Sequence, residues 1–523
     1  MPAAFLRSLD LPEPSLSDNR SHERRIRETL ASDLKLPVTE IFLPLQIARQ
    51  LPGLIREHGY RVDLVFCRDR HGYIVSGVFP KGCSPGVFGL AVDLGSTSVV
   101  FYLVDLRARR VVETVSRHNP QASHGDDILD RIIFASRGNG LQLMQQETAG
   151  LFNEVMADLC GRAGIRQDDI YYCSVAGNTT MCHLLLGLDP WHICREPYLP
   201  VVNRFDLISP EEVGLEMNPL GRLYLFPNIG SYFGGDLISG IIASGLHRQE
   251  EISLLVDVGT NAEVILGNRD WLVACAGAAG PALEGGILSC GTRAQPGAIE
   301  RVEIDPTTLD LSWQTIGEIP PVGLCGSGII DLLAALFLAG LVDSTGKLVV
   351  ERDPDRFRKI DDVWCYVVAD ESITGHGRPV YISQSDIKNL IRSKGAMYTI
   401  LNVVVQSVGV QFSDIQNFYV AGAFGTYISP DKAITIGMLP DISIDRFKGL
   451  GNAAGEGAVN MLLDASKMDE ANEICDRITY LEMNVRGDFM DQLTGALFLP
   501  HTDLSLFPSV AAKLKKLGRF STP

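Results

Sequence analysis

Two short segments each combine an aspartate, a glycine and hydroxyl side chains at the bend between two apolar runs. They are Asp93-Leu-Gly-Ser-Thr-Ser98 and Asp257-Val-Gly-Thr-Asn261. Glycine lets the backbone approach an anion closely, and the N–H groups of such a bend form a concave anion site. The hydroxyls of Ser96, Thr97 and Thr260 would add neutral donors. The two segments therefore predict phosphate-binding turns.

The aspartate of each segment needs a separate explanation, because a carboxylate repels a bare phosphate. Asp93 and Asp257 therefore imply a bridging cation, and hard, octahedral Mg²⁺ suits carboxylate and water ligands. We expect both side chains to be associated with the metal. Asp257 either shares the ion or orients the attacking water, which gives it a catalytic role.

A third segment, Phe418-Tyr-Val-Ala-Gly-Ala-Phe-Gly425, is an apolar strand that ends in closely spaced glycines. Such a turn lets a flat base and its ribose lie against the backbone. One of these motifs alone is weak evidence, but two matching hairpins and this turn together favour a nucleotide site. The expected nucleotide contacts are Asp93, Gly95, Ser96, Thr97, Ser98, Gly259, Thr260, Asn261, Gly422, Ala423 and Gly425.

The elements that must position these motifs follow a repeated plan. Each Asp-x-Gly hairpin is followed by a short polar turn and another apolar strand. Between and after the hairpins, strands alternate with helical patterns at residues 236–246, 328–341 and 385–408. Strand–helix alternation indicates an α/β fold, and the duplication indicates two similar lobes.

The first part of the chain lacks the Asp-x-Gly hairpins and has a different pattern of helix and strands. A helical pattern over residues 21–36 and two strand patterns at 62–67 and 73–79 predict a small α+β domain. The expected division is a flexible leader (1–20), the small domain (21–86), lobe I (87–250), lobe II with the adenosine motif (251–505) and a solvated C-terminal tail (506–523).

Composition excludes some functions. The net charge of −17 over 523 residues argues against a general binder of nucleic acid or of anionic membranes. None of the 11 cysteines forms a CxxC pair or has the spacing of a zinc or iron–sulfur site. We find no signal peptide and no apolar run of the roughly 20 residues that a bilayer needs. We expect a soluble, cytoplasmic protein.

At this point the sequence resembles the superfamily of actin, sugar kinases and heat-shock ATPases (ASKHA). Residues 93–98, 257–261 and 420–425 look like its two phosphate motifs and its adenosine motif. Residues 236–246 and 451–458 are similar to its two connecting helices, in the same order. Within it, the chain resembles the ATP-dependent reductive activators of corrinoid proteins at residues 176–181, 228–236, 280–285, 323–331, 383–388 and 495–500.

This resemblance implies an ATPase of the two-lobed actin-like fold that binds ATP and Mg²⁺. Its implied partner is a corrinoid protein of a methyltransferase system, whose cobalt(II) it reduces to cobalt(I). Relatives often pair as dimers. They typically carry an iron–sulfur domain ahead of the small domain, but the first cysteine here is Cys67. We therefore expect no iron–sulfur cluster in this chain, and an electron donor that is a separate protein such as a ferredoxin.

Some alternatives stay open. Asp236 matches the position of a water-positioning catalytic residue in relatives, but aspartate is also favoured as a helix N-cap; Glu263 and Glu284 are further candidates. Residues 178–180 either line the cleft between the lobes or cap the next helix. A small-molecule kinase of the same superfamily, or a nucleotide-controlled scaffold or chaperone without a redox step, would also fit the motifs.

Overall fold

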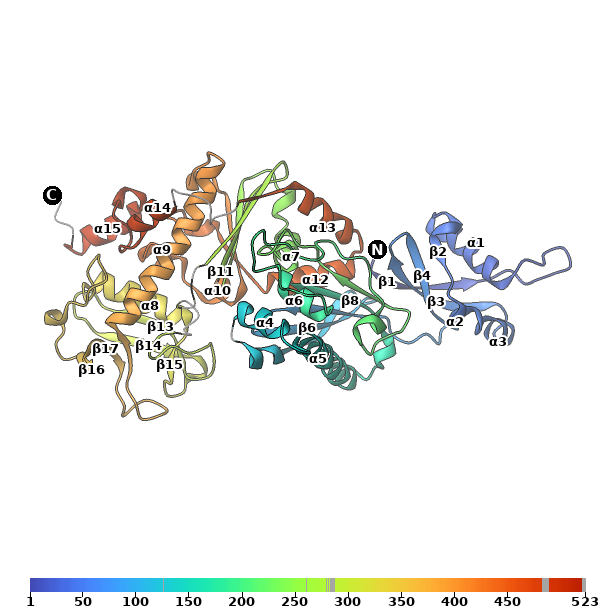
Figure 1. Cartoon of the computed structure of the whole chain (residues 1–523), viewed down its shortest axis with the longest axis horizontal. Helices are drawn as coiled ribbons and strands as arrows, with labels where there is room; N and C mark the ends of the chain where they lie inside the picture. Colours follow the sequence, from blue (N-terminus) through green and yellow to red (C-terminus); the bar gives the residue numbers. More distant parts are fainter. Residues whose placement is uncertain are drawn as a thin grey trace. The chain divides into compact units, whose positions relative to one another are not determined.

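The computed structural model describes residues 1–125, 127–259, 261–278, 280, 282, 287–481 and 489–519. The chain forms two compact units (Figure 1), each built from two stretches of sequence. Unit 1 consists of residues Met1–Ala243 and Ala453–Arg477, and unit 2 of residues Ser244–Asn452 and Ile478–Pro523. Each is described by itself.

Unit 1 begins with a small α+β domain. Its four-stranded sheet has the order β1-β3-β4-β2, and the buried side chains of Ile26 and Leu30 attach a helix to it. The expected helix and both expected strands are confirmed. The elements are β1 (Ala4–Asp10), α1 (His22–Leu34), β2 (Ile41–Phe42), α2 (Leu45–Ala48), α3 (Leu51–Glu57), β3 (Arg61–Asp69) and β4 (Gly72–Pro80).

The flexible leader expected over residues 1–20 is wrong for residues 4–10, which form a strand. Strand β1 pairs antiparallel with β3, from Ala4 opposite Cys67 to Asp10 opposite Arg61. Phe5 and Leu9 on this strand are buried in the domain core. The partner strand lies more than fifty residues away in sequence, so no local sequence pattern predicts this pairing.

Backbone and side-chain contacts join the small domain to the rest of unit 1. The Ala3 N–H donates to the Leu462 carbonyl at 2.8 Å, and the Ser76 hydroxyl donates to the Leu220 carbonyl at 2.8 Å. An ion pair at 2.7 Å joins Arg222 to the carboxylate on the end of β3. The domain is thus fixed to the following sheet at several points.

That following sheet has five strands in the order β7-β6-β5-β8-β9. The hairpin β5–β6 and the next strand β7 are antiparallel, whereas β8 and β9 are added in parallel. The elements are β5 (Phe88–Leu94), β6 (Ser98–Asp105), β7 (Arg110–His118), α4 (Ile128–Ala135), α5 (Gly140–Ala163), β8 (Ile170–Gly177), α6 (Thr179–Leu185), β9 (Arg222–Leu225) and α7 (Gly235–Ser244).

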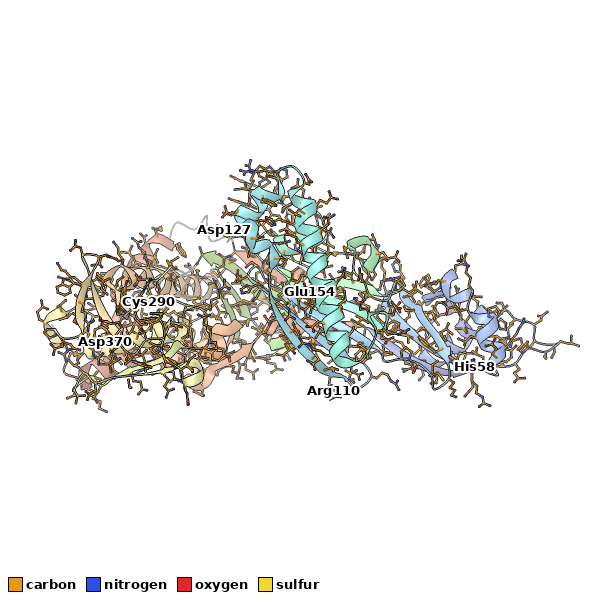
Figure 2. The ribbon with its side chains drawn as sticks, turned by 90° about the horizontal axis from the view of Figure 1, so that it is seen from below. His58, Arg110, Asp127, Glu154, Cys290 and Asp370 are labelled. Atoms are coloured by element: carbon orange, nitrogen blue, oxygen red, sulfur yellow. The ribbon has the colours of Figure 1, made fainter. Side chains whose placement is uncertain are left out.

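Two of the helices that follow β7 carry polar side chains labelled in Figure 2. Asp127 caps the start of α4 by accepting the Asp130 N–H at 2.8 Å, and Glu154 is exposed on α5.

Unit 2 repeats the plan. In its six-stranded sheet the order β12-β11-β10-β19-β20 has the same antiparallel and parallel pattern, and β21 is added beside β12. The expected duplication is therefore confirmed at the level of strand order. These elements are β10 (Ser253–Val258), β11 (Asn261–Gly267), β12 (Leu272–Ala278), β19 (Asn417–Ala421), α10 (Gly422–Tyr427), α11 (Pro430–Thr435), β20 (Phe447–Gly451) and β21 (Ile478–Leu481).

Two further three-stranded sheets, β14-β13-β15 and β16-β17-β18, complete unit 2. The long helix α9 packs against β11 and β12, and α8 carries an almost wholly buried apolar sequence. Their bounds are β13 (Ala298–Ile304), β14 (Leu311–Thr315), β15 (Gly323–Leu324), α8 (Gly326–Ala339), β16 (Phe357–Ile360), β17 (Val363–Ala369), β18 (Val380–Ser383), α9 (Gln384–Ser407) and α14 (Phe489–Ala496).

The division that placed all of residues 251–505 in lobe II is wrong for α12 (Ala453–Leu463) and α13 (Ser466–Arg477), which belong to unit 1. Helix α12 packs on β5, β6 and β8. Glycines allow α12 to pack closely: a Cβ at Gly455 would lie 2.5 Å from the Tyr102 ring on β6, and one at Gly457 would lie 2.1 Å from the Ser239 carbonyl oxygen on α7.

We therefore predict that Gly457→Ala lowers the free energy of unfolding by about 1–3 kcal/mol, because the new methyl group would overlap backbone that cannot swing aside. The matched variant Gly150→Ala places its methyl group on α5 with no atom within 4 Å. It should instead stabilise by about 0.5–1 kcal/mol, as alanine does in a helix. Urea unfolding compares the two, and equal stabilities would contradict the predicted packing.

The solvated tail expected over residues 506–523 is also wrong for its described part. Helix α15 (Pro508–Lys516) buries Val510 and Leu514 in the core of unit 2. The Lys513 ammonium pairs with Asp431 at 2.5 Å. The short apolar face of Val510 and Leu514 lies among three lysines, Lys513, Lys515 and Lys516, and this high local charge favours a solvated tail in the sequence.

Lys394 on α9 is a fully buried lysine. Its ammonium donates to the carbonyls of Phe498 and Pro500, which ties the segment after α14 to the helix. Burial lowers the pKa of the Lys394 amine well below its usual value. The unfolded chain therefore binds a proton that the folded protein releases.

The free energy of unfolding should consequently rise with pH between the lowered pKa and the ordinary lysine value, by up to about 1.4 kcal/mol per pH unit. Lys394→Met removes this contribution, so its pH profile should be flatter than that of the wild type. Exposed Lys388, on the same helix, supplies the control variant Lys388→Met, whose profile should follow the wild type. Urea unfolding at several pH values measures the slopes, and parallel profiles for all three proteins would disprove the assignment.

Candidate functional site

The first predicted phosphate turn joins β5 to β6, and its backbone carbonyls are held from one side. The Asn119 side-chain amide donates to the Gly95 carbonyl at 2.9 Å. The Arg131 Nη1 donates to the Ser96 carbonyl at 2.6 Å, and the Asn119 backbone N–H donates to the Thr97 carbonyl at 3.0 Å. Three successive carbonyls are thus fixed by two residues.

This arrangement determines where the N–H groups of the turn face. In a planar trans peptide the carbonyl of one residue and the N–H of the next point in opposite directions. The N–H groups of Ser96 and Thr97 have no hydrogen-bond partner among the described residues, and the turn is at the surface of unit 1. Adjacent free N–H groups of this kind form an anion-binding concavity, so the turn can accept a phosphate oxygen.

Carboxylates lie at the same edge of the sheet. Asp93 is near the carboxyl end of β5, opposite Ala176 on the parallel strand β8. The start of α7 reaches this edge as well, since a Cβ at Gly234 would lie 2.5 Å from the Asn178 Cα and 2.6 Å from the Asp236 Oδ1. Within unit 1 the structure therefore brings Asp93 and Asp236 to one edge.

The alternatives for residues 178–180 and Asp236 can now be compared with the structure. Asn178 is the N-cap of α6, and its side chain accepts the Met181 N–H at 2.9 Å. Asp236 is the second residue of α7, and its Oδ1 accepts the Leu237 N–H at 2.9 Å, a contact of the first helical turn. Capping is thus observed for Asn178, whereas the catalytic role of Asp236 stays a prediction.

In unit 2 the second hairpin has the same construction. Asp257 is near the carboxyl end of β10, paired with Glu263 across the hairpin and with Ala421 on the parallel strand β19. The Gly259 N–H donates to the Asn261 carbonyl at 2.9 Å and closes the bend. The hairpin therefore places Asp257 beside the end of the strand that leads into the expected adenosine motif.

The adenosine motif requires glycine for steric reasons. Gly422 has a φ of 77°, and a Cβ there would lie 3.1 Å from the Asp257 Oδ1. A Cβ at Gly425 would lie 2.0 Å from the Val420 carbonyl oxygen. The end of β19 and the start of α10 are thus packed without side chains, next to the Asp257 carboxylate.

Three predicted positions cannot be assessed in this way. Thr260, Glu284 and the side chain of Ala423 lie outside the described residues. The nucleotide-contact and metal roles assigned to the remaining positions stay predictions. The first phosphate turn belongs to unit 1, while the second hairpin and the adenosine motif belong to unit 2.

Sequence reasoning missed Asn119 and Arg131. Asn119 directly follows β7 and Arg131 lies on α4, neither in a recognisable motif, and Arg131 is completely buried. The only signal in the sequence is an arginine within the apolar pattern of residues 128–135, and the adjacent Asp130 makes an exposed polar face the simpler interpretation.

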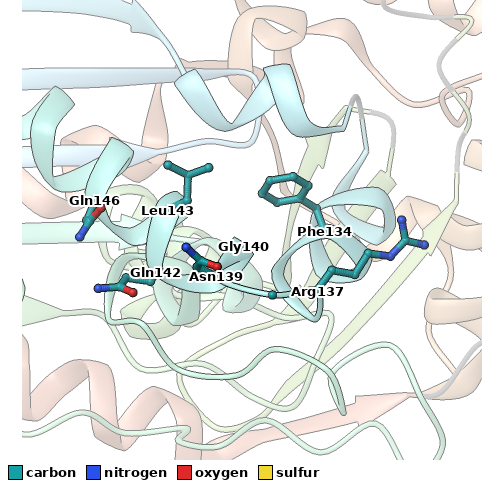
Figure 3. Close-up of a pocket in the computed structure, with 8 residues that line it drawn as sticks. Phe134, Arg137, Asn139, Gly140, Gln142, Leu143 and Gln146 are labelled. Atoms are coloured by element: carbon teal, nitrogen blue, oxygen red, sulfur yellow. The ribbon is translucent and has the colours of Figure 1, made fainter.

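A hollow of about 570 Å³ opens at the junction of α4 and α5. Figure 3 shows its lining, which includes Phe134, Arg137 and Leu143. None of the predicted site residues contributes to it. The hollow is therefore separate from the phosphate turn, although α4 borders both.

The cysteines favour a structural role. All eleven lie in the described part of the chain and are free. Burial raises the pKa of the Cys160 thiol to about 11 and that of the Cys475 thiol to about 12. Such thiols stay protonated at neutral pH. Among the described residues we also find no cluster of His, Cys, Asp or Glu side chains arranged to hold a metal, and no helix with the length and apolar character needed to cross a bilayer.

The duplicated sheet with its Asp-x-Gly hairpins defines the ASKHA class of fold, and comparison with known proteins agrees. Residues 251–511 match the domain described as the C-terminal ASKHA domain of RACo, residues 88–249 the RACo middle region, and residues 1–83 the RACo linker region. The chain belongs to the RACo family of reductive activators of corrinoid proteins.

Individual relatives support this membership. The chain is 32% identical to the corrinoid activation enzyme RamQ of Eubacterium limosum over 421 residues, covering 77% of this chain and 69% of RamQ. It is 24% identical to the [Co(II) methylated amine-specific corrinoid protein] reductase of Methanosarcina barkeri, covering 75% and 73%. A solved structure of a reductive activator for corrinoid, iron-sulfur protein superposes with a TM-score of 0.89 at 40% identity, covering 98% of this chain and 81% of the other.

Proposed function

We propose that this protein binds and hydrolyses ATP and couples the resulting conformational change to the reduction of a corrinoid protein. One electron converts cobalt(II) to cobalt(I), and ATP is hydrolysed to ADP and phosphate. The observation that carries the nucleotide part is the first phosphate turn, whose three carbonyls are fixed by Asn119 and Arg131 while the N–H groups of Ser96 and Thr97 remain available. The relatives' names support the corrinoid part.

Mg²⁺ fits the residues at both hairpins. Asp93 and Asp257 each supply a carboxylate next to a turn suited to phosphate, and hard carboxylate oxygens are ligands that Mg²⁺ prefers. The bound ion would neutralise phosphate charge. Phosphoryl transfer depends mainly on positioning and charge stabilisation, so Asp236 and Asp257 would act by orienting the attacking water.

The electron would come from a separate protein such as a ferredoxin. The corrinoid partner would belong to a methyltransferase system, and the complex would work in the cytoplasm, with this chain paired as a homodimer. Closure on the γ-phosphate is the kind of change that can be transmitted to a bound partner.

Phosphate release from ATP tests this proposal. The purified protein is assayed with Mg²⁺, with and without a cobalt(II) corrinoid protein, and the same corrinoid protein in the cobalt(I) state serves as the control. We expect turnover that rises with the cobalt(II) form. A rate of ATP hydrolysis that does not change with any corrinoid protein tried would refute the coupling. Absence of both ATP binding and ATP hydrolysis would refute the nucleotide assignment.

A further inference from the structure

Arg131 connects three parts of unit 1 through one buried guanidinium. Its side chain is 0% exposed. The Nε donates to the Gly125 carbonyl at 2.9 Å, and the Nη1 donates to the Ser96 carbonyl at 2.6 Å and approaches the Met181 Sδ at 3.6 Å. The guanidinium therefore lies between α4, the phosphate turn and α6.

Burying a guanidinium is costly unless its N–H groups are well used. Here two of them donate to backbone carbonyls: that of Gly125, in the loop before α4, and that of Ser96, in the phosphate turn. Asn119 donates to the Gly95 and Thr97 carbonyls on either side of Ser96. Its side-chain amide also lies 3.6 Å from the Met181 sulfur. Arg131 and Asn119 thus share a sulfur neighbour as well as a turn.

We propose that Arg131 is a positioning residue for the phosphate group of the nucleotide. It fixes the Ser96 carbonyl, so the N–H of Thr97, in the same peptide group, faces the opposite side of the turn. This inference rests on the proposed nucleotide binding, and it assigns the role to a residue that does not itself touch the ligand.

Loss of Arg131 should affect phosphate-bearing ligands and adenosine differently. Arg131 acts on the turn that would hold phosphate, whereas the adenosine motif lies in unit 2. Loss of Arg131 should therefore weaken binding of MgATP and MgADP but leave binding of adenosine unchanged. A residue needed only for folding would weaken all three alike.

The experiment compares Arg131→Met and Arg131→Lys by calorimetric titration with MgATP, MgADP and adenosine. We expect Arg131→Met to raise the Kd for both nucleotides by about tenfold to a hundredfold, because a Thr97 N–H turned away from the phosphate loses a hydrogen bond to a charged group. Arg131→Lys keeps the charge but cannot span both carbonyls, so a smaller but measurable loss of about threefold to tenfold is expected. The Kd for adenosine should stay within about twofold of the wild type in both variants.

Two arginines supply matched controls. Arg137 lies in the same segment, is exposed and lines the α4–α5 hollow (Figure 3), so Arg137→Met tests the loss of a positive charge. Arg25 is 1% exposed and donates to the Pro12 and Asp18 carbonyls in the small domain, so Arg25→Met tests the loss of a buried arginine. Both should bind MgADP like the wild type.

The possible results distinguish failure of the Arg131 inference from failure of the proposed nucleotide binding. Folded Arg131→Met with wild-type affinity for MgADP would overturn the inference, as would an equal loss for MgADP and adenosine. If Arg131→Met does not fold, Arg131→Lys decides, and wild-type nucleotide affinity in that variant would overturn the inference as well. If the wild-type protein itself binds neither nucleotide, the proposed function fails instead.

Discussion

Replacing Asp257 with asparagine should lower the rate of ATP hydrolysis by about 100-fold or more. Asp257 lies near the carboxyl end of β10, pairs with Glu263 across the hairpin, and has its carboxylate beside Gly422 of the adenosine motif. Asparagine keeps the shape of the side chain but removes the charge that would hold Mg²⁺ and orient water. Because catalysis of phosphoryl transfer depends on such electrostatic positioning, the loss should appear mainly in kcat.

Asp270 provides the control for this variant. It lies exposed in the turn between β11 and β12 of the same unit, so Asp270→Asn removes one negative charge away from the hairpin bend and should hydrolyse ATP at the wild-type rate. Steady-state phosphate release at saturating MgATP measures both variants. Wild-type turnover by Asp257→Asn would remove Asp257 from the catalytic machinery and leave Glu263 as the remaining described carboxylate of that hairpin.

The second large effect is expected at the first phosphate turn. In Gly95→Ala the new Cβ would lie 2.5 Å from the Ser98 carbonyl oxygen, so the backbone of the turn must open. Opening would displace the Gly95 carbonyl from Asn119 and spoil the alignment of the N–H groups of Ser96 and Thr97. We expect the Kd for MgADP to rise by about tenfold or more, since hydrogen bonds to a charged group are each worth about 1.5–3 kcal/mol.

A glycine with open surroundings is the control. A Cβ at Gly53 in the small domain meets no atom within 4 Å, so Gly53→Ala should bind MgADP like the wild type. Circular dichroism would show whether Gly95→Ala retains its sheet, since β5 and β6 pair over seven residues and should survive. A folded Gly95→Ala protein with unchanged affinity would exclude this turn as the phosphate site.

The sequence was most informative where structure is decided locally. In the β5–β6 and β10–β11 hairpins, two apolar strands flank a bend at Gly95 or Gly259, and each partner strand is the next one along the chain. The repeat of this pattern was enough to predict two similar lobes. The shared strand order of the two main sheets bears that out.

The errors involve contacts between distant segments. Strand β1 pairs with β3 across the whole of α1 to α3, and α12 returns from far along the chain to lie on β5 and β8. Helix α15 is held by Phe507 and Val510 in a core made by earlier residues. Local periodicity does not specify which distant segment a strand or helix packs against, so these contacts cannot be predicted from a single sequence.

In the candidate site, too, the contacts between distant segments could not be predicted from the sequence. Asp93, Gly95 and Asp257 stand inside motifs whose spacing points to phosphate chemistry, and they could be selected directly. Asn119 and Arg131 support the turn from a separate loop and helix, and only the folded chain shows that their donors meet the carbonyls of residues 95–97.

The central claim is that nucleotide drives reduction of a corrinoid protein, and one measurement tests it most directly. A cobalt(II) corrinoid protein is mixed anaerobically with this protein and a low-potential reductant, and cobalt(I) is followed by its absorbance after MgATP is added. The account predicts cobalt(I) formation that requires MgATP and is lost in Asp257→Asn. Cobalt(I) formation at the same rate without nucleotide, or none with it although ATP is hydrolysed, would contradict the claim.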